Sequence, residues 1–146
     1  PVLVLDNPDS PEINLERSRL AEARGGTADS LPLQLPFHGE WRVTQGFDGP
    51  HTHQQPWQHA LDFDIAENGR NHGGDGALRE DYFCFGAPVL APAAGQVVRL
   101  CDDLADSLPG DADIANNWGN FILLRVGGLH GLLAQLKRGS IKVCIG

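Results

Sequence analysis

The sequence predicts an all-β protein, in which antiparallel sheets form a small sandwich or half-open barrel with long loops, preceded by a short N-terminal helical extension. Three observations predict this class. The 146 residues include 18 glycines and 10 prolines, which is a turn-rich composition. Several short segments alternate apolar and polar residues, the period of a strand with one buried face. The length and the 41% apolar content suit one domain with its own core.

Residues 1–35 are expected to form an extension and linker, and residues 36–146 the β-rich domain. Residues 14–24 (NLERSRLAEAR) predict one surface helix, with Asn14 as its N-cap and two glycines directly after it. The segment 31–36 (LPLQLP) contains prolines, which donate no backbone hydrogen bond, so it is not expected to be a central strand.

The domain is expected to be a meander of short strands joined by loops. The predicted strands are residues 41–44, 59–65, 88–92, 95–100, 120–126, 129–136 and 140–143. A loop rich in Gly, Asn and Asp is expected at residues 66–81, and an acidic loop at 102–117. The acidic loop lacks the spacing of a calcium-binding loop, so a solvated loop is the favoured interpretation.

Charge and composition exclude several classes of function. The formal net charge of −8 argues against a nucleic-acid-binding surface and does not support binding to an anionic membrane. No uninterrupted apolar window is long enough for a transmembrane span. Cys84, Cys101 and Cys144 contain no C-x-x-C pair, so a structural zinc knuckle is not expected. Three small apolar residues, or one disulfide with a free thiol, both remain open.

The densest group of potential metal ligands is His51, His53, His59, Asp62 and Asp64. On a regular strand Leu61 and Phe63 face the core, and Asp62 faces the opposite side. His59 leans towards the core side, so the partner of Asp62 is expected to be one of the two histidines in the preceding loop. Imidazole and carboxylate groups suit zinc, and the alternative is a set of ordinary surface polar residues.

Short sequence blocks follow one another in order across residues 36–146. They are residues 39–46 (GEWRVTQG), 52–54 (THQ), 59–63 (HALDF), 85–97 (FGAPVLAPAAGQV), 117–120 (NWGN) and 133–143 (LAQLKRGSIKV). In order and spacing these blocks resemble the lysostaphin/LytM-type zinc metallopeptidase domain. The resemblance implies a Zn²⁺-dependent endopeptidase that cuts peptide cross-links of peptidoglycan. It also implies a location in the cell envelope, periplasmic or extracellular.

The resemblance assigns roles to individual residues. Asp62 matches the carboxylate ligand of zinc and His53 the histidine ligand, with His51 as second choice, although the connection between His53 and Asp62 is longer than is usual in the family. Gln135 stands where the family has its catalytic histidine, and glutamine has no titratable nitrogen with which to move a proton.

The family's last block, P-H-L-H, would supply the third ligand and does not occur in these 146 residues. We therefore expect a chain truncated before that motif and inactive by itself. Two hypotheses follow, a zinc metalloendopeptidase or a catalytically inactive domain that binds the cell wall or a protein partner. The sequence does not indicate the oligomeric state.

Overall fold

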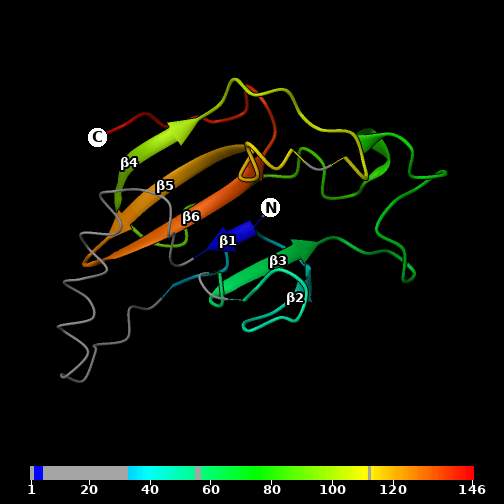
Figure 1. The fold of residues 1–146 in the computed structure, drawn as a ribbon, viewed down its shortest axis with the longest axis horizontal. Helices are drawn as coiled ribbons and strands as arrows, with labels where there is room; N and C mark the ends of the chain where they lie inside the picture. The colour runs from blue at the N-terminus through cyan, green and yellow to red at the C-terminus, as the bar shows by residue number, and fades with distance from the viewer. Residues whose placement is uncertain (1, 5–32, 55–56, 112) are drawn as a thin grey trace.

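The computed structural model describes residues 2–4, 33–54, 57–111 and 113–146, and these form an antiparallel β-sheet with long loops (Figure 1). Its strands are β1 (Val2–Val4), β2 (Arg42–Gln45), β3 (Ala60–Asp64), β4 (Gln96–Cys101), β5 (Asn120–Val126) and β6 (Leu129–Leu136), with a short 3₁₀ helix η1 (Arg79–Asp81). The predicted all-β class is confirmed, whereas the helix predicted at residues 14–24 lies outside the described residues. No helix in the described part of the chain is long and apolar enough to cross a membrane.

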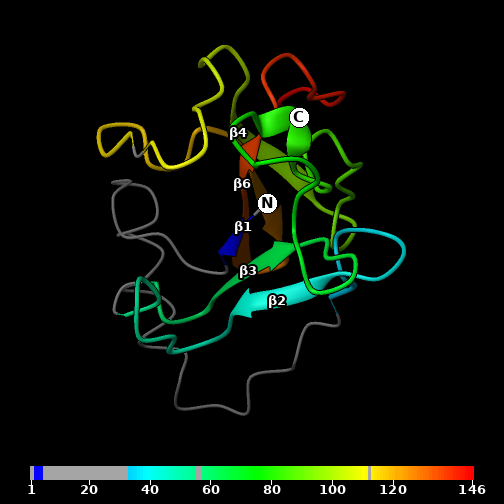
Figure 2. The same cartoon turned by 90° about the vertical axis from the view of Figure 1, so that its right-hand side faces the viewer.

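The strands lie in the order β2-β3-β1-β6-β5-β4, and every neighbouring pair is antiparallel. The sequence analysis assigned no strand to residues 2–4, yet β1 joins the ladder β2–β3 to the ladder β4–β5–β6. Val2 pairs with Asp62 of β3 on one side and with Ala134 of β6 on the other. In Figure 2, β2 and β3 cross the view while β6 is seen nearly edge-on, so the sheet is strongly twisted. This topology places Asp62 on β3, one strand in from the edge strand β2.

The strand predicted at residues 88–92 is wrong, because prolines interrupt its pairing. Gln34 N donates to Pro92 O over 2.8 Å, and Leu90 N donates to Pro36 O over 2.6 Å. These two bonds hold the segment against residues 34–36, on the sheet face that carries Phe37. Prolines at positions 36, 88 and 92 have no N–H group, so the ladder cannot extend in either direction.

The strand predicted at residues 140–143 is also wrong, because a side chain takes its backbone donors. Ser140 N and Ile141 N each donate to the carboxylate of Asp102 over 3.2 Å. Asp106 Oδ1 accepts likewise from Arg138 N over 2.7 Å. Aspartates of the acidic loop therefore anchor the segment after β6, and β4 remains an edge strand of the sheet.

Apolar side chains cover both faces of the sheet. One face, here called the tryptophan face, carries a cluster of Ala60, Phe121, Leu123, Leu132 and Ala134, against which Trp57 and Trp118 pack. The opposite face carries Phe37, Phe63 and Leu133, with the partly buried Leu61 beside them. The predicted inward orientation of Leu61 and Phe63 is thus confirmed. Since side chains alternate along β3, Asp62 lies on the tryptophan face with Ala60.

The three cysteines are free thiols. Cys84 and Cys101 are half-buried, and Cys144 is exposed. The alternative of one disulfide is therefore wrong in this structure. Cys101 Sγ donates instead to Asp103 Oδ1 over 3.3 Å.

Candidate metal centre

An imidazole and a carboxylate meet on the tryptophan face. His53 Nε2 lies 3.2 Å from Asp62 Oδ1. His53 comes from the loop between β2 and β3 and is 3% exposed, whereas the Asp62 side chain is 29% exposed. His51, the second-choice ligand, is exposed. The contact required by the sequence interpretation is therefore present for His53, while metal binding by the pair stays a prediction.

The other ring nitrogen of His53 fixes the orientation of the imidazole. His53 Nδ1 lies 2.8 Å from Gly46 O, which can only accept a hydrogen bond, so Nδ1 carries a proton and donates it. In the neutral ring, Nε2 then directs a lone pair at Asp62 Oδ1. Two acceptors at this distance require a cation between them, either a second proton or a metal ion. A histidine that donates its second nitrogen to a backbone carbonyl is the usual arrangement of a metal ligand.

The spacing of the two ligand atoms fits a tetrahedral ion. With bonds of about 2.0–2.1 Å to zinc, two ligands at the tetrahedral angle lie about 3.3 Å from each other. The observed separation between His53 Nε2 and Asp62 Oδ1 is 3.2 Å. Within the described ranges, no group of three or more His, Cys, Asp or Glu side chains is placed to hold a metal. The described part of the chain therefore offers two ligands, which suit zinc in type and in spacing.

Asp64 is the next acidic side chain on the same face, and it is already paired. Both of its oxygens accept from Arg42, at 2.9 Å from Nε and 2.6 Å from Nη2. This hydrogen bonding, together with the charge of Asp64, raises the pKa of the Arg42 guanidinium. A bidentate pair of this kind neutralises Asp64 and occupies both of its oxygens, so Asp64 is not counted among the candidate ligands.

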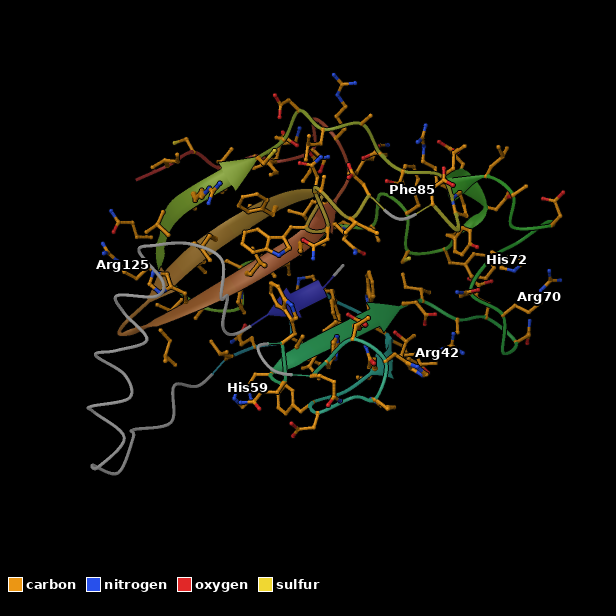
Figure 3. All side chains as sticks on the ribbon, viewed as in Figure 1. Arg42, His59, Arg70, His72, Phe85 and Arg125 are labelled. Atoms are coloured by element: carbon orange, nitrogen blue, oxygen red, sulfur yellow. The ribbon has the colours of Figure 1, made fainter. Side chains whose placement is uncertain are left out.

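His59 lies at the start of β3, at the end opposite to Arg42 (Figure 3). It is half-buried and precedes the strand, so it does not join the core beside Phe63 as its alternation with that residue suggested. Its ring meets Phe47 edge-on at 6.1 Å, and its Nε2 lies 3.2 Å from Gln58 Nε2. These contacts assign His59 to packing of the loop.

Gln135 is brought onto the tryptophan face by an irregularity in β6. Asn120 pairs with Leu136 and Ile122 with Leu133, so Ala134 and Gln135 together oppose one residue of β5. The extra residue of a β-bulge interrupts the regular alternation of side chains, and Ala134 beside it packs in the cluster of the tryptophan face. Gln135 has φ 56°, a left-handed conformation that glutamine rarely adopts, and its backbone N donates to Trp118 O over 2.7 Å.

The pairing of β3 and β6 with β1 gives the distance across the sheet between Asp62 and the neighbour of Gln135. Asp62 and Ala134 both pair with Val2, so their backbones lie two strand spacings apart, about 9.5 Å. Gln135 follows directly and is exposed. It can therefore contact a bound molecule that extends across the sheet from Asp62. Within the described contacts, Gln135 touches neither His53 nor Asp62.

The sequence analysis missed one residue of the centre. Gln45 Nε2 donates to Asp62 Oδ2 over 3.1 Å. The only available signal was its place in the block at residues 39–46, because the pairing of Gln45 with Asp62 depends on a bulge in β2. Comparison of the chain with models of protein families, with curated proteins and with solved structures found no match. The function of the centre is therefore argued from its geometry and chemistry.

Proposed function

We propose that this chain is a zinc-binding domain of the metalloendopeptidase type, whose reaction is the hydrolysis of peptide bonds in the cross-links of peptidoglycan in the cell envelope, and that with Gln135 and two ligands it has little activity by itself. The observation that carries the proposal is the His53–Asp62 pair, in which a backbone carbonyl orients the imidazole and the ligand atoms lie 3.2 Å apart. The ordered sequence blocks that resemble the LytM-type domain add the reaction and the substrate class.

In this proposal each residue has a limited task. His53 and Asp62 hold the metal, and Gly46 O keeps the imidazole in the tautomer that binds it. Bound zinc would polarise a peptide carbonyl and activate water for attack. Gln135 can donate a hydrogen bond to a peptide and accept one from it, but it cannot take up a proton at neutral pH. Proton transfer by the side chain at position 135 is therefore the step of the reaction that this chain supports least.

Zinc titration of two matched histidine variants tests the metal site. His53→Gln is expected to lower the affinity for zinc by at least about 100-fold, because loss of a ligand exceeds the effect of losing a residue that only supports one. His51→Gln, in the same loop but exposed, is expected to stay within about twofold of the unsubstituted chain. Calorimetry measures both, with the Tm of each zinc-free variant as a check of folding. Equal affinities for the two variants would contradict the proposed ligand.

Restoring a proton carrier at position 135 tests the reaction. With zinc, Gln135→His is expected to raise the hydrolysis of a peptidoglycan cross-link peptide by about 100-fold or more, the usual contribution of a general acid or base. Gln135→Asn is the control, because asparagine and histidine both tolerate the left-handed backbone found there. Mass spectrometry of the cleaved peptide is the measurement. A histidine variant no faster than the asparagine variant would contradict the endopeptidase assignment.

A second candidate function is a non-catalytic module that binds the cell wall or a protein partner. The observation that favours it is Gln135 itself, an exposed amide on the face of the metal centre where a proton carrier would be needed. Under this alternative, peptidoglycan fragments bind to the chain with zinc present and are recovered uncut, whichever residue occupies position 135. Binding and cleavage measured on the same fragments separate the two functions.

A further inference from the structure

Gln45 is held by a complete set of hydrogen bonds between the metal centre and its supporting loop. Its Nε2 donates to Thr52 Oγ1 over 2.6 Å and to Asp62 Oδ2 over 3.1 Å. Its Oε1 accepts from His51 N over 3.1 Å and from Thr52 N over 3.2 Å. An amide has two donors and two acceptor lone pairs, so every hydrogen-bonding position of this side chain is used.

Local backbone structure brings Gln45 to this place. Arg42 and Val43 pair regularly with β3, after which the register shifts, so that Gln45 lies opposite Asp62. The extra residue, Thr44, forms a β-bulge, a device that redirects the side chain beside it. Gly49 leaves room for the amide, since a Cβ at that position would lie 2.3 Å from Gln45 Cγ.

From this geometry we infer that Gln45 is the positioning residue of the metal centre. It occupies Asp62 Oδ2 and so directs Oδ1 towards His53 Nε2. It also binds the backbone of the turn that leads into His53, and thereby couples the positions of both ligands. The inference rests on the proposed zinc-binding function and adds the residue that sets the geometry of the ligands. Supporting residues of this kind typically contribute 10- to 100-fold, to an order of magnitude, in metal affinity.

The test uses Gln45→Met, which keeps a long, unbranched side chain and removes all four hydrogen bonds. Its matched control is Gln54→Met. Gln54 Nε2 donates to Gly49 O over 2.9 Å, so it closes the same loop without contacting Asp62. Calorimetry gives the zinc Kd, and the visible absorption of bound Co²⁺ reports the ligand geometry. Gln45→Met is expected to raise the zinc Kd by about 10- to 100-fold and to change the cobalt spectrum, and Gln54→Met to do neither.

Measurements on the zinc-free protein separate positioning from general loosening of the loop. The amide protons of His51 and Thr52, which donate to Gln45 Oε1, are expected to exchange faster in Gln45→Met, while the zinc-free variant keeps a cooperative unfolding transition. A zinc Kd for Gln45→Met within twofold of the unsubstituted chain overturns the inference and leaves the proposed function intact. Equal increases in Kd for the two variants overturn it as well. Absence of saturable zinc binding by the unsubstituted chain overturns both.

Discussion

Asp62→Asn should remove zinc binding while leaving the zinc-free protein folded. The carboxylate meets two partners of different kinds, since Gln45 Nε2 donates to Oδ2 and the lone pair of His53 Nε2 faces Oδ1. Asparagine has the same shape and can satisfy both. Its amide oxygen accepts from Gln45, and its amide nitrogen donates to His53. The substitution therefore replaces a contact that needs a cation by a neutral hydrogen bond.

The expected difference appears when zinc is added. At a zinc concentration 100 times its Kd, binding stabilises the unsubstituted chain by about 2.7 kcal/mol, and Asp62→Asn should show none of this gain. Urea unfolding with and without zinc measures it. Asp111→Asn is the control, because it removes the same charge from an exposed position in the acidic loop.

The opposite result has a definite meaning. If the pair serves only as an ion pair between a protonated imidazole and a carboxylate, Asp62→Asn lowers the stability of the zinc-free chain and zinc stabilises neither protein. If zinc instead raised the free energy of unfolding of Asp62→Asn as much as that of the unsubstituted chain, the metal would bind elsewhere. Both results would contradict the proposed centre.

Much of the sheet could be predicted because short apolar runs and the turn residues that bound them are local properties. Residues 120–126 and 129–136 are such runs, and the structure forms strands with these same limits. The two segments that were wrongly predicted as strands, residues 88–92 and 140–143, contain apolar residues typical of strands. Their backbone N–H groups, however, are absent or already hydrogen-bonded to a side chain. Prolines remove them at residues 88–92, and Asp102, far away in the sequence, accepts them at residues 140–141.

The contact between His53 and Asp62 was predictable from the sequence, but the residues that surround it were not. That Leu61 and Phe63 face the core already places Asp62 on the other side, and a loop histidine is then its nearest partner. By contrast, Gln45 and Gln135 reach the tryptophan face through β-bulges, each of which shifts the alternation by one residue. Such a shift depends on the pairing of two strands, so the pattern of one strand does not reveal it.

The core beneath the centre should be sensitive to the loss of a single side chain, Leu132. It is 1% exposed and packs in the cluster of the tryptophan face with Phe121 and Leu123. It lies in β6, two residues before Ala134, which shares a row of paired residues with Asp62. Leu132→Ala should lower the free energy of unfolding by about 2–5 kcal/mol, because the closely packed neighbours cannot fill the cavity completely.

Leu129→Ala makes the same chemical change at the first residue of the same strand, where the side chain is 41% exposed. It should lower the free energy of unfolding by about 1 kcal/mol or less, since little packing is lost. Urea denaturation of both variants, with comparison of their m-values, is the measurement. A loss for Leu132→Ala no greater than that for Leu129→Ala would contradict the assignment of Leu132 to the core. A large loss together with weakened zinc binding in the folded fraction would show that this cluster also keeps β3 in the register on which the contact between Asp62 and His53 depends.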